Sequence, residues 1–308
     1  MLRSTLFAVI VTGVVLVSCA EGPGGVDNGV SAPSSVATQY ATTHYPIVLH
    51  HGFLGFDRVF RVDYFYQVSE TLKHRGFDVY TTRVSPVATI ARRAEQLKEQ
   101  IDMILRTTGS RKVNIVAHSM GGLDARYLVS VLGYGDRVAS ITTLGTPHRG
   151  SRLADLVLGT SGETAKLVMK TFAAVWNVSG DEADGEVDIR GALHDISIQF
   201  MTNEFNRFAL DHPDVYYQSF AGETSLTGFG SRDRVDAPLH LTYALLKLTD
   251  GVNDGLVTRA SAEWGDFRGT LPADHINLVG HLFGSTSASF HHLALYEEIG
   301  RGLASRGL

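Results

Sequence analysis

The chain has 308 residues, 44% hydrophobic and 19% charged, so it can bury a sizeable core as one large domain or two small ones. The net charge is −5 at pH 7, and the lysine and arginine residues are scattered rather than clustered, which argues against nucleic-acid binding. Cys19 is the one cysteine of the sequence, so an intramolecular disulfide is excluded.

The first residues are typical of an export signal. Arg3 precedes an apolar run, residues 6–17, that is short for a membrane span but suits a signal peptide. The run ends in L-V-S-C, which resembles the bacterial lipobox, where the cysteine is lipidated. We therefore expect a signal peptide with lipobox over residues 1–19 and a lipid anchor on Cys19. The expected location is a bacterial cell envelope, on the membrane; an ordinary secretory signal with an incidental cysteine is the alternative.

Residues 20–44 are rich in Gly, Ser, Pro, Ala and Thr and have no apolar periodicity, which predicts a flexible tether. From Tyr45 onward, short apolar runs alternate with helical patterns, as in Ile90, Ala94 and Leu97, and Gly109 would stop that helix. The predicted strands are 46–50, 77–81, 113–117 and 139–144, and the predicted helices are 63–76, 90–109 and 123–132. This alternation predicts an α/β fold, a mostly parallel sheet with helices on both faces, in one domain over residues 45–308.

The stretch V-N-I-V-A-H-S-M-G-G-L-D, residues 113–124, runs apolar and then breaks into small and polar residues. A strand that turns sharply into a helix would hold Ser119 in a strained conformation above the carboxyl end of the sheet. Gly121 is the small residue needed after the serine, and Ala117 stands where glycine is usual. The pattern predicts a nucleophile elbow; a surface turn with an incidental serine is the alternative.

A serine nucleophile needs a base and an acid that orients the base, and both should follow the serine in the chain. In G-V-N-D-G-L-V, residues 251–257, Asp254 is our candidate acid, with Asp250 as its competitor. His275, about twenty residues later in a polar loop, is the candidate base, and His281 is second. The remaining histidines weighed for a role are expected to be surface or core residues, namely His44, His74, His148, His194, His212 and His240.

Backbone amides should stabilise the oxyanion. One is that of Met120, directly after the nucleophile. The other is that of Phe53, in H-H-G-F-L-G-F, residues 50–56, where Gly52 permits a tight turn after the first strand. A turn that serves only topology is the alternative.

The segment 151–178 has more apolar surface than one buried helix face requires. It predicts a lid or cap over about residues 151–190, either a lid that opens against a lipid surface or the fixed cap of an esterase. The apolar residues are Leu153, Leu156, Val157, Leu158, Leu167, Val168, Met169, Phe172, Val175 and Trp176.

Five motifs occur in the order seen in bacterial true lipases of the Pseudomonas and Burkholderia type, and the chain from Tyr45 onward resembles that group of α/β-hydrolases. The motifs are H-G-F-L-G-F-D at 51–57, the elbow at 113–122, T-L-G-T-P-H-R-G-S at 143–151, N-D-G-L-V at 253–257, and the His275 loop. The resemblance implies a triacylglycerol lipase with Ser119, Asp254 and His275 as the triad, and with the amides of Phe53 and Met120 as the oxyanion hole. It leaves open whether a folding chaperone is needed.

Several positions depart from that group. Relatives commonly carry glycine in place of Ala117. The resemblance also implies a structural calcium ion, held in part by an aspartate two residues after the histidine and a glutamine four further on; Asn277 and His281 stand there. Asp236 could match the other calcium aspartate. These replacements argue for weaker calcium binding or its loss, and no residue is assigned to a metal.

The function expected from the sequence is that of a serine hydrolase, most simply a triacylglycerol lipase. It would cleave carboxylic esters of lipids at a lipid–water interface through an acyl-enzyme on Ser119, with no cofactor in the chemistry. The alternatives are another acyl hydrolase on the same scaffold, such as a carboxylesterase, phospholipase, thioesterase or polyester depolymerase, or a non-catalytic lipid-binding surface protein.

Overall fold

The computed structural model describes residues 42–53, 58–59, 62–159, 188–228, 233–281, 284 and 286–308. These belong to one compact unit, residues 39–308. The predicted signal and lipobox, residues 20–41 of the predicted tether and residues 160–187 of the predicted lid lie outside the described residues. Within the described ranges, no helix combines the length and the apolar character that a membrane span requires.

The described residues form a six-stranded sheet in the order β10-β7-β6-β5-β1-β4, and every pair of neighbouring strands is parallel. In chain order the strands are β1 (Ile47–His50), β4 (Val79–Thr82), β5 (Val113–His118), β6 (Val138–Leu144), β7 (Tyr216–Gly222) and β10 (Asp266–Leu271). His50 pairs with Ala117, and Ala117 pairs with Thr143, so the carboxyl ends of the central strands meet at one edge of the sheet. The predicted parallel α/β fold is confirmed.

The central strands are buried on both faces, which is why they read as continuous apolar runs. All residues of β5 and β6 are buried. On β1, Ile47 and Leu49 belong to one core cluster and Val48 to the other, because side chains alternate across a strand.

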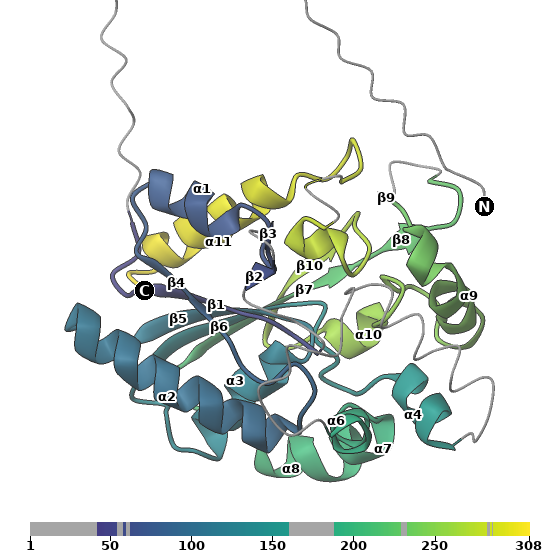
Figure 1. The fold of residues 1–308 in the computed structure, drawn as a ribbon, viewed down its shortest axis with the longest axis horizontal. Helices are drawn as coiled ribbons and strands as arrows, with labels where there is room; N and C mark the ends of the chain where they lie inside the picture. Colours follow the sequence, from purple (N-terminus) through teal and green to yellow (C-terminus); the bar gives the residue numbers. More distant parts are fainter. Residues whose placement is uncertain are drawn as a thin grey trace, which may run out of the picture. The chain divides into compact units, whose positions relative to one another are not determined.

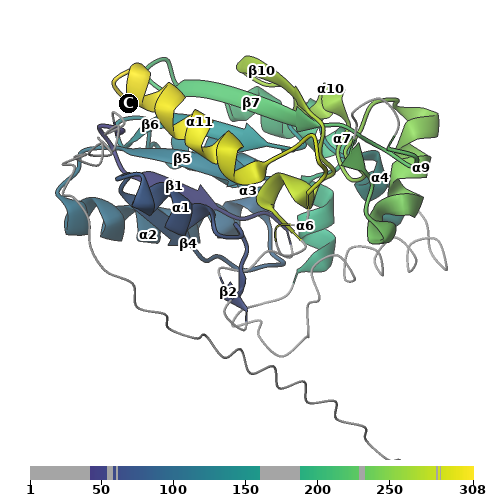
Figure 2. The ribbon, with the colours of Figure 1, turned by 90° about the horizontal axis from the view of Figure 1, so that it is seen from above.

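Helices cover the two faces of the sheet (Figures 1 and 2). On one face lie α2 (Ile90–Thr108) and α3 (Gly121–Ser130), and on the other lie α1 (Val68–His74) and α11 (His292–Ser305). The helix predicted at 90–109 is present as α2. The Thr89 side chain caps its start, and Gly109 ends it in the left-handed conformation at φ 69°.

The helix predicted at 63–76 is shorter than expected. Val62–Asp63 forms strand β3 with β2 (Arg58–Val59), and α1 begins only at Val68. Gln67 precedes the helix with φ 58°, which a helical residue cannot have. Tyr64 lies before that turn and is fully buried. Its hydroxyl lies 2.7 Å from Nδ1 of His118, the last residue of β5, so this part of the segment packs into the interior instead of forming the first turn of a helix.

The remaining elements are short or lie outside the central sheet. They are α4 (Arg152–Gly159), α6 (Ile189–Asp195), α7 (Ile198–Phe200), the π-helical turn Met201–Phe205, α8 (Asn206–Phe208), β8 (Thr224–Ser225), β9 (Asp233–Arg234), the 3-10 turn Ala237–Leu239, α9 (His240–Thr249), α10 (Arg259–Ala262) and the 3-10 turn Asn277–Val279.

Candidate active site

Ser119 lies in the sharp turn between β5 and α3, at the carboxyl edge of the sheet. Its φ is 55°, and among the described residues only Gln67 is another non-glycine residue with positive φ. The Ser119 amide donates to the carbonyl oxygen of Leu144 (2.9 Å), and Thr146 Oγ1 donates to the carbonyl oxygen of Ser119 (2.7 Å). This strained, doubly held turn is the geometry that the sequence predicts for a nucleophile elbow.

Small residues are required around the elbow because backbone segments approach closely. A Cβ added to Gly121 would lie 2.6 Å from the carbonyl oxygen of His51, and one added to Gly52 would lie 2.6 Å from the Cβ of Ser119. Ala117, in contrast, is fully buried in β5 within the core shared with α2 and α3. The extra methyl group is accommodated there as ordinary core packing.

Asp254 and His275 form a buried pair. His275 Nδ1 lies 2.7 Å from Asp254 Oδ2, and both side chains are at most 2% exposed. Asp254 Oδ1 accepts the backbone amides of Leu256 (3.0 Å) and Val257 (2.7 Å), which fix the carboxylate. The competing acid, Asp250, instead binds Arg152 near the surface (2.7 Å). The structure therefore pairs the expected acid with the expected base.

The nucleophile, the base and both residues of the expected oxyanion hole border one cavity. Its lining is Phe53, Ser119, Met120, Pro147, Ser151, Ile196, Leu256, Val257 and His275. Met120 stands at the start of α3, where backbone amides lack intrahelical partners. Apart from Ser119, Ser151 and His275 this lining is apolar.

Two buried polar features next to the site were not predicted from the sequence. One is His118, which is fully buried beside Ser119; its ring lies 4.5 Å from that of His275, and burial holds its pKa well below the ordinary histidine value. The other is an ion pair between Arg93 and Asp124 (2.7 Å), in which Arg93 Nη2 also donates to the carbonyl oxygen of His51 (2.8 Å). The available sequence signal was an arginine on the apolar face of a predicted helix, among Ile90, Ala94 and Leu97.

The side chains expected to hold calcium do not fit this ion. Asn277 Nδ2 donates to Asp233 Oδ2 (2.8 Å), so an amide hydrogen occupies the place where a cation shared by these two side chains would lie. Asp233, and not Asp236, is thus the carboxylate that meets Asn277. The His281 ring packs edge-on against Tyr64, with 6.1 Å between centroids. Asn277 Oδ1 has no hydrogen-bond partner, but calcium requires six to eight oxygen ligands.

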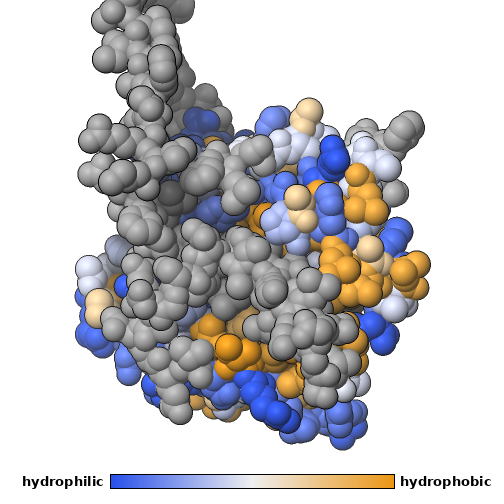
Figure 3. Space-filling model, turned by 45° about the vertical axis from the view of Figure 1, so that its right-hand side comes forward, coloured by the Kyte–Doolittle hydropathy of each residue, from blue (hydrophilic) through white to orange (hydrophobic). Residues whose placement is uncertain are grey.

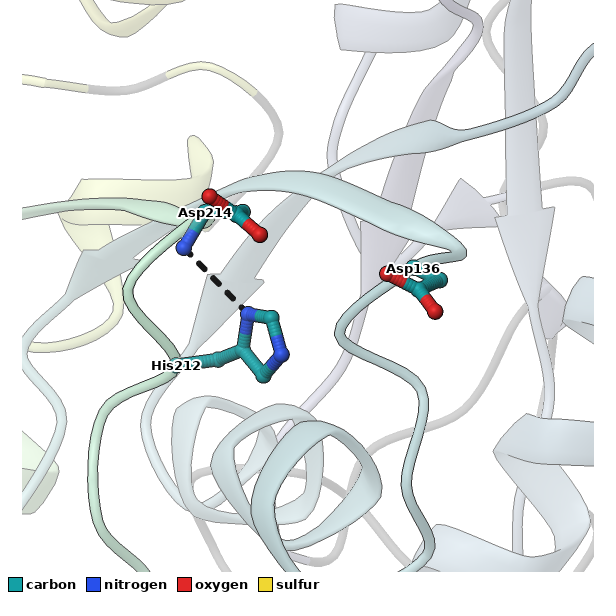
Figure 4. Close-up of side chains that lie close together, drawn as sticks. All are labelled: Asp136, His212 and Asp214. Atoms are coloured by element: carbon teal, nitrogen blue, oxygen red, sulfur yellow. Dashed lines mark hydrogen bonds between the residues drawn. The ribbon is translucent and has the colours of Figure 1, made fainter.

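Within the described ranges, one group of histidine and aspartate side chains is close enough to share a metal ion. It comprises Asp136, His212 and Asp214, whose ligand atoms lie within 4.8 Å of one another (Figure 4). These residues precede β6 and β7, at the edge of the sheet opposite Ser119. His212 Nδ1 accepts the Asp214 amide (3.3 Å), so the other ring nitrogen carries the proton and has no lone pair for a metal. We assign no metal ion to this group.

The cavity is bordered by Ser151, at the start of the predicted lid, and by Ile196, which lies six residues beyond the expected end of the lid near residue 190. Ser151 precedes α4, on which Leu153 and Ala154 are buried, and Ile196 follows α6. The side that bears α9 comes forward in Figure 3, where apolar residues gather in several patches. On α9, Leu241 is 37% exposed and Leu248 is 86% exposed. The described part of this side therefore presents apolar surface to solvent.

Comparisons with known proteins identify the family. The family model of the alpha/beta hydrolase fold matches residues 45–165. A triacylglycerol lipase of Pseudarthrobacter phenanthrenivorans is 42% identical, over 82% of this chain and 94% of its own length. Others, from Burkholderia plantarii and Vibrio cholerae, are 38% and 30% identical and cover 94% and 96% of this chain and 93% and 99% of their own.

Solved structures support the same fold. A Bacillus licheniformis lipase has a TM-score of 0.61 at 23% identity, over 79% of this chain and 89% of its own. A metagenomic carboxyl esterase has a TM-score of 0.65 at 21% identity, over 90% of this chain and 80% of its own. Together with the sequence relatives, these likenesses show that the chain belongs to the bacterial lipases of the α/β-hydrolase superfamily.

Proposed function

We propose that this protein hydrolyses carboxylic esters of lipids, with triacylglycerols as the main substrates, through an acyl-enzyme on Ser119. The observation that carries this proposal is that Ser119 and His275 line the same cavity, while His275 Nδ1 lies 2.7 Å from Asp254 Oδ2. The proposal also rests on relatives named triacylglycerol lipase that align along nearly their whole length.

The first half-reaction makes an acyl-enzyme. Asp254 accepts a hydrogen bond from His275 Nδ1–H and so keeps the proton on Nδ1, which leaves Nε2 with the lone pair that can take the Ser119 proton. The serine oxygen attacks the ester carbonyl carbon, and the amides of Phe53 and Met120 stabilise the negative oxygen. When the bond to the alcohol oxygen breaks, the proton on His275 passes to that oxygen and a neutral alcohol departs.

The second half-reaction restores the enzyme. His275 takes a proton from a water molecule, whose oxygen attacks the acyl carbon, and the same amides stabilise the second oxyanion. Collapse breaks the bond to Ser119, and His275 returns its proton to the serine oxygen. The net change is one ester and one water converted into one fatty acid and one alcohol.

The chain's own residues support a histidine loop that needs no calcium ion. Asp233 Oδ2 accepts both the Asn277 side chain (2.8 Å) and the Asp274 amide (3.0 Å), and Asp274 Oδ2 accepts the Asp236 amide (2.8 Å). Asp274, directly before His275, is fully buried, and burial raises its pKa well above the ordinary value. These bonds hold Asp274 and Asn277, on either side of the base.

We further propose that the protein is exported and anchored through a lipid on Cys19, with residues 20–44 as the tether. The lipobox pattern L-V-S-C supports the anchor. Phase partitioning in a cloud-point detergent tests it. We expect the wild-type protein in the detergent phase and Cys19→Ser in the aqueous phase; equal partitioning of the two contradicts a lipid anchor.

Hydrolysis of a series of short to long acyl esters, across each substrate's solubility limit and with Ser119→Ala alongside, tests the proposed function. We expect long-chain triacylglycerols to be cleaved fastest once droplets form, and Ser119→Ala to fold normally without turnover. Cleavage of short soluble esters alone would make the protein a carboxylesterase with a fixed cap. A folded wild-type protein that neither turns over nor reacts with a fluorophosphonate would be a binding protein.

A further inference from the structure

A chain of buried hydrogen bonds links the two loops that carry the catalytic groups. The Gly52 amide lies 3.4 Å from Tyr64 Oη, Tyr64 Oη lies 2.7 Å from His118 Nδ1, and His118 Nε2 lies 2.9 Å from the carbonyl oxygen of His275. Gly52 precedes the oxyanion residue Phe53. All four of these side chains or backbone groups belong to the buried interior.

The direction of each bond follows from its ends. A carbonyl oxygen can only accept, so His118 Nε2 must carry the proton that it donates to His275. In a neutral ring Nδ1 then has the lone pair, and it accepts the Tyr64 hydroxyl hydrogen. Tyr64 Oη in turn accepts the hydrogen of the Gly52 amide. Every donor in the chain has an acceptor, and one tautomer of His118 satisfies them all.

We propose that Tyr64 and His118 are positioning residues of the hydrolytic reaction. Their hydrogen bonds connect the loop of Gly52 and Phe53 to the loop of His275 and keep both loops correctly placed relative to Ser119. His118 is suited to this place because it is the residue directly before the nucleophile and its ring lies 4.5 Å from that of His275. This inference rests on the proposed function, since it assigns roles relative to Ser119 and His275.

A neutral His118 also favours the proton transfer to His275. His275 becomes positively charged when it takes the serine proton, and a second charge at 4.5 Å would oppose that step. Burial keeps the pKa of His118 well below its ordinary value, so the ring beside His275 carries no charge at neutral pH. The Tyr64 hydroxyl, which donates to Nδ1, favours the same neutral form.

The test compares Tyr64→Phe with Tyr296→Phe. Both hydroxyls are buried, and Tyr296 Oη donates to the carbonyl oxygen of Leu278 (3.2 Å), so each variant loses one buried hydroxyl. Measurements on the purified protein are kcat and KM for p-nitrophenyl butyrate, the melting temperature, and the rate of inactivation by a p-nitrophenyl phosphonate ester. The phosphonate reports on the nucleophile and the oxyanion hole without requiring turnover.

We expect Tyr64→Phe to lower kcat and the inactivation rate by roughly 10-fold to 100-fold, with KM changed less than about threefold, because displacing an oxyanion donor costs less than removing it, which lowers kcat by roughly 100-fold to 1000-fold. Tyr296→Phe should keep kcat within about twofold at a similar melting temperature. Equal kcat values for the two variants would overturn the inference. If wild-type protein shows neither turnover nor inactivation, the proposed function fails first, and the comparison of variants is then void for that separate reason.

A second variant tests whether the chain acts as a unit. His118→Asn retains an oxygen that can accept the Tyr64 hydroxyl hydrogen, but its side chain is too short to reach the His275 carbonyl. Combined with Tyr64→Phe it should cost little beyond the larger single effect, because either change already interrupts the same chain. Two effects that multiply independently would show that Tyr64 and His118 do not act together.

Discussion

Replacing Asp254 by asparagine should nearly abolish catalysis without unfolding the protein. The backbone amides of Leu256 and Val257 donate to Asp254 Oδ1 (3.0 and 2.7 Å), so an asparagine keeps its oxygen there. Its NH₂ group then takes the place of Oδ2, opposite His275 Nδ1. Two N–H donors cannot bond to each other, so His275 moves its proton to Nε2 and no longer has a lone pair for the serine proton.

The size of the effect follows from two steps. Turning the asparagine the other way would restore the working tautomer but would forfeit two backbone hydrogen bonds of about 1 kcal/mol each, so the wrong tautomer accounts for a loss of roughly 30-fold. The remaining loss comes from the missing carboxylate charge, which no longer stabilises the positively charged His275. In serine proteases the same change lowers kcat on the order of 10⁴-fold, or about 5.4 kcal/mol of transition-state stabilisation. We therefore expect kcat for Asp254→Asn to fall by about 10⁴ at neutral pH.

The assay is release of p-nitrophenol from the butyrate ester, with circular dichroism as the check on folding. Asp250→Asn is the matched control, because Asp250 lies four residues away and binds Arg152 near the surface, where exposed ion pairs contribute little. Its kcat should stay within about twofold of wild type. A loss smaller than tenfold for a folded Asp254→Asn, or a larger loss for Asp250→Asn, would refute the assignment of the acid.

Three other outcomes follow. In Gly121→Ala a methyl group would lie 2.6 Å from the His51 carbonyl oxygen, so we expect a melting temperature several degrees lower. Gly302→Ala, with nothing within 4 Å, should raise it by a few degrees, and equal shifts in calorimetry would contradict this reasoning. Burial lowers the pKa of His281 to about 4, so the folded state resists protonation and stability falls as pH drops from about 6.5 to 4. In urea unfolding, His281→Gln should make the free energy of unfolding less dependent on pH over this range, by about 1.4 kcal/mol per pH unit, which is the contribution of one proton. Finally, EDTA and millimolar calcium should give equal melting temperatures, whereas a micromolar calcium site would separate them by on the order of 10 °C.

Much of the site could be predicted because its residues follow local rules. Strand β5 is buried on both faces, so it reads as an apolar run, and the small residues after it mark the turn that carries Ser119. The acid and the base were expected in chain order after the serine. Asp254 was the acid expected from the sequence, with Asp250 as its competitor four residues earlier. The coordinates separate the two, because Asp254 lies on His275 and Asp250 lies on Arg152.

The residues that were missed make their contacts across long stretches of chain. Tyr64 and His118 are 54 positions apart, and His118 meets the His275 carbonyl 157 positions away. The apolar periodicity of a helix or strand predicts which of its faces is buried, but not which distant residue it contacts. The predicted start of the helix at 63 was wrong for the same reason: Tyr64 lies against His118 and cannot also begin a helix there, although its sequence fits the apolar spacing.

The parallel sheet also bears on how fast the chain folds. Parallel strands cannot pair through a tight turn, so every pairing in the order β10-β7-β6-β5-β1-β4 requires a crossover and brings together distant parts of the chain. Such non-local contacts slow folding, because loop-closure entropy is lost before the contacts form. Gly222, at the end of β7, abuts Asp254: a Cβ there would lie 2.7 Å from that of Asp254. Hydrolytic activity therefore requires the non-local pairing of β7 to be complete, which makes recovery of activity a stricter measure of refolding than recovery of helix content.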